Sequence, residues 1–111
     1  MQNEYAVAIM DANPVGVGHT LVVPQRHVAS VFDIPAKELK ALWGLACEVR
    51  QKLQESHQPD GFNIGVNDGL AVGQLFAHAH IHIIPRHRGD SPDPRSGVRW
   101  VLPKQARYWS L

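Results

Sequence analysis

The pattern of apolar and polar residues along the chain predicts several short strands and one long helix. Short apolar or alternating runs, closed by turns rich in glycine, proline and asparagine, are typical of strands. The runs expected to form strands are residues 5–10, 19–23, 62–67 and 77–84, with 98–102 as a candidate edge strand. Pro85 is expected to stop the strand before it, because proline donates no backbone hydrogen bond to a sheet.

The long helix is expected from about Pro35 to Glu55, since proline is tolerated in a first helical turn. Apolar residues recur there at three- and four-residue steps and form one buried stripe: Leu39, Leu42, Trp43, Ala46, Val49 and Leu53. Cys47 is expected to be a small buried or half-buried residue of the same helix. Strands in local order with one inserted helix predict an α+β fold, in which the helix packs on one face of an antiparallel sheet of about five strands.

Length and composition bound the class of protein. A chain of 111 residues, 44% hydrophobic and 19% charged, is long enough for one domain and too short for two, so 1–111 is expected to be a single domain. No apolar run approaches the roughly 20 residues of a membrane span, and the first residues lack the pattern of a secretory signal. The single Cys47 excludes an internal disulfide and a cysteine zinc site. These features predict a cytoplasmic protein without a membrane partner.

Charge is unevenly distributed along the chain. The net charge of +1 predicts no nucleic-acid partner. Residues 1–84 carry five basic and eight acidic side chains, which gives −3, whereas residues 85–111 carry six basic and two acidic ones, which gives +4. This C-terminal segment is also rich in proline and glycine, so mostly loop is expected. Its arginines are either a solvated surface or contacts for phosphate groups, whose oxygens match guanidinium geometry.

The strongest chemical signal is an alternating row of histidines, HAHIH, at residues 78–82. In a strand, alternate side chains point to opposite faces, so His78, His80 and His82 would share one face at intervals of about 6.6 Å. Ala79 and Ile81 would share the other face with Ile83, where the helix can cover them. Three imidazoles gathered on one surface are therefore expected to form a functional site.

Three interpretations of this histidine row are open. It can be a solvent-facing row with no role, or a metal site, since imidazole is a common zinc ligand and Asp68 and His19 are available as further ligands. It can also be a catalytic site, in which one ring attacks while a neighbour donates a proton. We favour catalysis, because histidine titrates near neutral pH without help from its surroundings.

Two sequence blocks together carry a family resemblance. Residues 18–24 (GHTLVVP) and 73–86 (GQLFAHAHIHIIPR) resemble the histidine triad (HIT) superfamily of nucleotide hydrolases and transferases. The resemblance runs from about Tyr5 to Arg86, and residues 85–100 look like bacterial and archaeal members described as diadenosine-polyphosphate hydrolase-like. It implies a HIT-like fold and a homodimer in which two subunits join edge to edge, which would also remove an exposed strand edge.

The resemblance also implies roles for four histidines. His80 would attack the α-phosphorus of a nucleotide and form a covalent nucleotidyl-imidazole. His82 would hold phosphate oxygens and help the leaving group depart, and His78 and His19 would support the nucleophile. A neutral imidazole approaches an anionic phosphate without charge repulsion, and covalent capture divides one difficult displacement into two easier steps.

Three further positions, Asp11, Asn67 and Gln74, match binding residues of the family, and Gly73 and Arg86 are further candidates for substrate binding. Asp11 matches the position that binds both ribose hydroxyls, as a carboxylate can. Asn67 matches a polar position that faces phosphate, and Gly73 with Gln74 lies at the mouth of the phosphate site. Arg86, at the end of the matching block, is a candidate contact for a long polyphosphate.

The resemblance implies a hydrolase that cleaves the α-phosphate linkage of a dinucleoside polyphosphate or a related purine nucleotide conjugate. No cofactor or metal is required in this scheme, although Mg²⁺ can accompany a polyphosphate. One alternative is an adenosine phosphoramidase, and another is a nucleotide-binding module without relevant turnover. Leu75 stands where many relatives have serine or threonine, which weighs against an amine leaving group.

Overall fold

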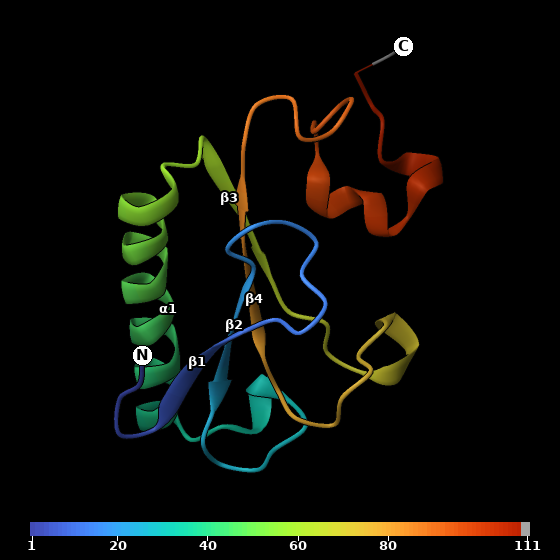
Figure 1. Ribbon diagram of the computed structural model, residues 1–111. Helices are drawn as coiled ribbons and strands as arrows, with labels where there is room; N and C mark the ends of the chain where they lie inside the picture. The colour runs from blue at the N-terminus through green and yellow to red at the C-terminus, as the bar shows by residue number, and fades with distance from the viewer. Residues whose placement is uncertain (110–111) are drawn as a thin grey trace.

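The computed structural model describes residues 1–109 and contains a four-stranded sheet with one long helix on one face (Figure 1). Its elements are β1 (Ala6–Met10), β2 (Thr20–Pro24), α1 (Ala36–His57), β3 (Gly61–Gly65) and β4 (Ile81–Arg86). The strands lie in the order β1-β2-β4-β3, and all neighbours are antiparallel. The α+β architecture predicted from the sequence is confirmed.

Helix α1 begins immediately after Pro35 and ends at His57, two residues beyond the predicted end. Its buried stripe consists of Leu42, Leu45, Ala46, Val49 and Leu53. The core prediction for Trp43 is wrong, because its side chain is 43% exposed, and Cys47 is exposed as well. Both residues follow a buried position directly, and one helical step of about 100° turns them to the edge of the stripe.

Strand β4 begins at Ile81, four residues later than predicted. Its pairing with β2 ends where Val22 lies opposite Ile81. Pro24 follows in β2 and has no N–H with which to extend the ladder. The backbone N–H of Ala79 instead donates to the carbonyl of Val28 at 2.7 Å. The segment that carries the first two histidines of the row is therefore irregular rather than a strand.

Strand β4 also continues through Pro85 to Arg86, so the prediction that Pro85 stops it is wrong. Pro85 lies opposite Phe62 of β3. On its other side β2 has already ended, since the first residue of β2, Thr20, lies opposite Ile83. With a single partner strand at this point, β4 accommodates proline as an edge strand does.

The candidate strand at residues 98–102 is absent from the described residues. Gly97–Val101 forms a turn of 3-10 helix there, and Pro103–Gln105 forms another. Ser96, immediately before the first turn, has a left-handed backbone (φ 59°), which breaks an extended run. In Figure 1 this C-terminal segment lies on the opposite side of the sheet from α1.

The two faces of β4 separate structure from chemistry. Ile81 and Ile83 are fully buried and belong to the core with the stripe of α1. His82 and Ile84 point to the other face, which α1 leaves open. The open face is therefore where the candidate site must be built.

Among the described helices, none combines the length and the apolar character that a membrane crossing requires.

Candidate active site

The three histidines of the row line one cavity of about 660 Å³. His82 belongs to β4, whereas His78 and His80 lie in the irregular segment before it. The rings of His80 and His82 are 4.9 Å apart at their centroids and meet edge to face. Asp11, from the loop after β1, lines the same cavity. The three histidines therefore share one face, as predicted, although β4 begins later than predicted.

His80 presents an unprotonated nitrogen to this cavity. Its Nδ1 lies 2.8 Å from the backbone carbonyl oxygen of His78. A carbonyl only accepts hydrogen bonds, so Nδ1 carries the proton and donates it. The remaining lone pair is on Nε2. The ring is only 9% exposed, so the surrounding structure fixes its orientation. In this arrangement, Nε2 is the ring nitrogen of His80 that is free to accept a hydrogen bond or to form a bond.

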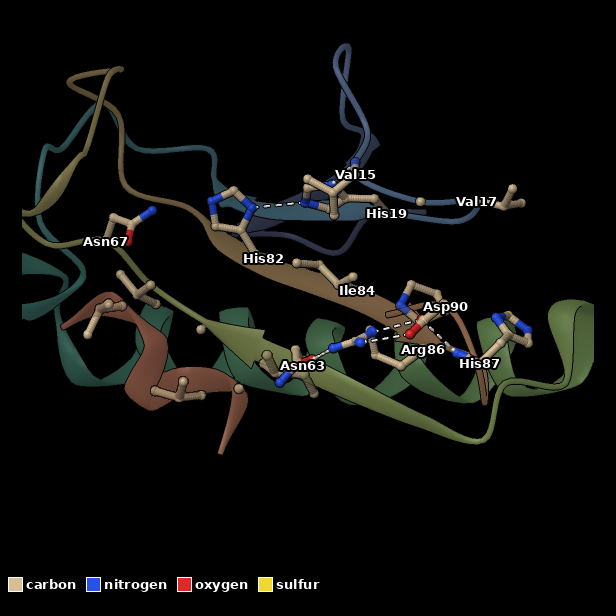
Figure 2. Close-up of a pocket in the computed structure, with 18 residues that line it drawn as sticks. Val15, Val17, His19, Asn63, Asn67, His82, Ile84, Arg86, His87 and Asp90 are labelled. Atoms are coloured by element: carbon tan, nitrogen blue, oxygen red, sulfur yellow. Dashed lines mark hydrogen bonds and ion pairs between the residues drawn. The ribbon is translucent and has the colours of Figure 1, made fainter. Parts of the chain in front are cut away.

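A chain of hydrogen bonds places the proton of His82 on Nε2, whereas the proton of His80 is on Nδ1. The N–H of Val15 donates to His19 Nδ1 at 3.2 Å, so the proton of neutral His19 is on Nε2. His19 Nε2 lies 2.9 Å from His82 Nδ1 (dashed line in Figure 2), and because it carries the proton it donates to His82 Nδ1. His82 Nδ1 is consequently an acceptor, and the proton of His82 is on Nε2. The site thus pairs an unprotonated nitrogen on His80 with a hydrogen-bond donor on His82.

His82 stays neutral at pH 7. Burial lowers the pKa of this imidazole, and the neighbouring rings of His80 and His19 lower it further, while Asp11 opposes them. Because the folded-state pKa lies below the ordinary value of about 6.5, the unfolded chain takes up the proton first as pH falls. The contribution of His82 to the free energy of unfolding is therefore fully present above about pH 6.5, and it is lost as the pH falls below that value.

Asp11, His19 and His82 are the one metal-competent set found among the described residues, with ligand atoms within 4.8 Å of one another. The ring centroids of His19 and His82 lie 5.2 Å apart and the bonded nitrogens 2.9 Å apart. Two ring radii account for the difference, so the nitrogens point directly at each other. That geometry suits a shared proton, whereas a bound ion needs both lone pairs aimed at a third point.

His78 contacts His80 through its backbone carbonyl and is held in place by its own side chain. Its Nε2 donates to the carbonyl oxygen of Pro24 at 2.8 Å. The ring of His27 packs against it edge to face, with centroids 5.5 Å apart. These contacts hold the carbonyl of His78 where it accepts the proton of His80.

Three of the substrate-binding residues predicted from the sequence line the same cavity as the histidines. Asp11, Asn67 and Gly73 all line it. Asp11 Oδ1 accepts the N–H of Asn13 at 2.8 Å, and Oδ2 lies 3.4 Å from His19 Nε2. The carboxylate is thus oriented at the cavity wall, where it retains acceptor capacity.

Gln74 does not line this cavity, because its side chain is used to hold the loop around it. Its oxygen accepts the N–H of Gly69 at 2.8 Å. Its amide group donates to the carbonyls of Ala29 and Phe76. The residue is only 7% exposed. In this structure Gln74 fixes the loop that leads into His78.

Arg86 lies at the far end of β4 and is already paired. Its guanidinium donates to both carboxylate oxygens of Asp90, to Asn63 and to Ser91. The Arg86 guanidinium holds the pKa of the Asp90 carboxyl far below its usual range. Arg86 does not line the cavity that holds His80.

Backbone groups are the part of the site that sequence patterns do not reveal. The N–H of Val15 and the carbonyls of Pro24 and His78 select which nitrogen of each ring is protonated. Every residue offers the carbonyl, and every residue except proline offers the N–H. No sequence signal could therefore have identified them.

The HIT domain family model matches residues 1–89 of the chain. The chain belongs to the HIT family. The match includes both blocks that carry the resemblance and every histidine of the site. The segment from residue 90 onward lies outside the matched part of the HIT domain.

Known HIT proteins resemble this chain over most of its length. It is 41% identical over 86 residues to an uncharacterized HIT-like protein of Mycoplasma genitalium, covering 78% of this chain and 61% of that protein. It is 35% identical over 89 residues to the bis(5'-nucleosyl)-tetraphosphatase [asymmetrical] of Schizosaccharomyces pombe, covering 80% and 49%. A HIT family protein crystal structure from Bacillus anthracis superposes with a TM-score of 0.77 at 29% identity, covering 81% and 64%.

The chain therefore spans from about half to three fifths of the length of these curated HIT relatives. Membership of the HIT family accounts for the fold and for the gathering of the four histidines.

Proposed function

We propose that this chain is a nucleotidyl hydrolase that cleaves the α-phosphate linkage of a dinucleoside polyphosphate through a covalent bond to His80. The observation that carries the proposal is the complementary hydrogen bonding of two adjacent rings. His80 has a free Nε2 because its Nδ1 donates to a carbonyl, and His82 has a proton on Nε2 because its Nδ1 accepts. The similarity to a bis(5'-nucleosyl)-tetraphosphatase supports the choice of substrate class.

The first step needs no proton transfer. His80 Nε2 attacks the α-phosphorus, and the bridging phosphorus–oxygen bond breaks with its electron pair on the departing oxygen. The imidazole keeps its Nδ1 proton and becomes a cation, which its bond to the carbonyl of His78 stabilises. The Nε2–H of His82 donates a hydrogen bond to the phosphoryl or departing oxygen as negative charge develops there.

In the second step, water attacks the phosphorus and the phosphorus–nitrogen bond breaks, returning its electron pair to His80 Nε2. One proton of the water is released to solvent. The products are a nucleoside monophosphate and the departing polyphosphate fragment. Asp11 accepts hydrogen bonds from the ribose hydroxyls, and Asn67 donates to phosphate oxygens, as their places on the cavity wall allow.

The neutral state of His82 favours an anhydride over a phosphoramidate substrate. A polyphosphate departs as an anion and needs only hydrogen-bond stabilisation. An amine must gain a full proton as it departs, which neutral His82 does not supply, since its pKa is lowered by burial. The nearby Leu75, which lines the cavity, offers no hydroxyl to help. Adenosine phosphoramidase activity is therefore expected to be secondary.

We expect kcat/KM for diadenosine tetraphosphate to exceed that for an adenosine phosphoramidate by at least about tenfold. Both substrates share the adenylyl group, so the ratio isolates the departing group. Product release measured under identical conditions gives the ratio, with a chelator present and absent to test the expected independence from metal. A ratio favouring the amine would select the phosphoramidase alternative, and failure of both substrates, with adenosine monophosphate still bound, would select the binding module.

A homodimer is part of the same proposal. β1 and β3 are the two edge strands of the sheet, and Ile64 of β3 is 39% exposed. Pairing of an edge strand with that of a second copy would satisfy its open backbone groups. Size-exclusion chromatography with light scattering should give about twice the 12.3 kDa of one chain at micromolar concentration. A mass of one chain under these conditions would contradict the dimer and leave the hydrolase proposal intact.

A further inference from the structure

A second cavity of about 820 Å³ lies on the open face of the sheet, beyond His82. Figure 2 shows its floor on β4 and β3 and the loop with Val15 and Val17 on one side. The 3-10 turn Gly97–Val101, which we term the C-terminal wall, lines the same cavity from the other side. The C-terminal wall lies outside the region that matches the family model.

The two cavities meet at His82. His82 and Asn67 line both of them, whereas His80 lines only the first. A substrate bonded at phosphorus to His80 therefore keeps its nucleotidyl half in the first cavity. The fragment beyond the broken bond lies on the side of His82, at the mouth of the second cavity.

On the basis of the proposed function, we propose that the second cavity seats the departing half of the substrate and that this half is a nucleoside polyphosphate. A cavity of about 820 Å³ lies within the size range of sites that bind nucleotide-sized molecules. A small departing group would fill little of it. The C-terminal wall thus determines specificity for the departing fragment.

The apolar lining indicates where the base of that fragment lies. Val15 and Val17 on the loop and Val98 and Val101 on the C-terminal wall are each at least 70% exposed. Exposed apolar side chains gathered around one cavity mark a binding surface. A planar base packed against part of this apolar lining would have its phosphates towards His82 and Asn67, which also line this cavity.

Arg86 and Arg99 are hydrogen-bonded within the protein and support the structure around this cavity. Arg86 closes one end, where its guanidinium is occupied by Asp90 and Asn63. Arg99 donates to the carbonyls of Gln105 and Ala106, and so ties the C-terminal wall to the turn that follows. The polar end of the cavity therefore suits the neutral sugar or base edge better than additional phosphates.

The C-terminal wall is fixed against the sheet by a close approach. Gly97 lies so near Asn63 that a Cβ on it would be 3.0 Å from the Asn63 amide nitrogen. The indole N–H of Trp100 donates to the carbonyl of Arg95 at 3.0 Å. The cavity wall is thus held in place before any ligand binds.

The test compares two substrates that share the adenylyl group. Diadenosine tetraphosphate departs with a nucleotide, whereas adenosine 5'-phosphorofluoridate departs with a single fluoride ion that cannot occupy the second cavity. Val98→Asp and Val101→Asp should each raise KM for diadenosine tetraphosphate about 10- to 100-fold. For the phosphorofluoridate, kcat/KM should stay within about twofold of the unaltered protein. Leu102→Asp is the matched control, because Leu102 is 73% exposed in the same segment and does not line the cavity.

The double variant Val98→Ala with Val101→Ala removes apolar surface without adding charge and should change KM in the same direction by a smaller factor. Thermal unfolding of each variant verifies that the fold is retained. Equal effects on both substrates, or none on either, would overturn the assignment of the second cavity while leaving the hydrolase proposal standing. If the unaltered protein hydrolyses neither substrate, the proposed function itself fails.

Discussion

His80→Ala should lower kcat for diadenosine tetraphosphate by on the order of 10⁴-fold or more, the scale found when a covalent nucleophile is removed. The affinity for adenosine monophosphate should change only a fewfold, because Asp11 and Asn67 remain on the cavity wall. His57→Ala is the control, since it removes an imidazole that lines neither cavity. Steady-state kinetics and equilibrium binding of the three proteins separate chemistry from binding.

A smaller side chain at the same position offers an internal check. His80→Gly leaves a space in which free imidazole can act as the nucleophile, so added imidazole should restore part of the lost turnover. Retention of more than about a tenth of the original kcat by His80→Ala would show that another group attacks the phosphorus. Thermal unfolding of the variants guards against loss of the fold.

His82→Gln should be far more active than His82→Ala. The amide nitrogen of glutamine places an N–H close to that of His82 Nε2, so we expect about a tenfold loss of kcat. The alanine variant has no donor, and a loss of about 10²- to 10³-fold is expected, as for removal of one donor to a developing anion. Equal inactivity of both variants would show that His82 must transfer its proton.

Nitrogen chemical shifts of the imidazole rings test the same claim without turnover. At pH 7, His82 should be neutral with its proton on Nε2, and its titration midpoint should lie below about 6.5, because burial lowers its pKa. His80 should carry its proton on Nδ1, as its bond to the carbonyl of His78 requires. A proton on Nδ1 of His82, or a midpoint above 6.5, would contradict the assigned chain of hydrogen bonds.

The sequence predicted the gathering of the histidines from side-chain alternation, and the gathering is retained although His78 and His80 lie outside the paired strand. His78 and His80 lie before β4 begins and still line the cavity of His82. The predicted limits of β4 were wrong because they depend on its partner strand, β2. Pro24 is the last residue of β2, and Thr20, its first residue, lies opposite Ile83, so β2 does not reach Pro85. Pattern alone does not show where a neighbouring strand ends.

The sequence could not show which charges are free. Arg86 was a candidate phosphate contact, yet Asp90, four residues later, engages its guanidinium on two nitrogens. Arg95 is paired with Asp93 in the same way and stacks over Trp109. These two arginines hold the C-terminal segment together, so their charge is engaged within the protein and does not form a free binding surface. Only the folded geometry distinguishes the two cases.

The central claim, that His80 becomes covalently bonded to phosphorus, is tested most directly by the stereochemistry at that phosphorus. A dinucleoside polyphosphate with a chiral thiophosphate at the α-position, hydrolysed in ¹⁸O-labelled water, gives a nucleoside thiophosphate whose configuration can be determined. Each in-line displacement inverts the phosphorus, so two successive displacements through His80 predict overall retention. Overall inversion would mean that water attacks the substrate directly, and the covalent account would be wrong.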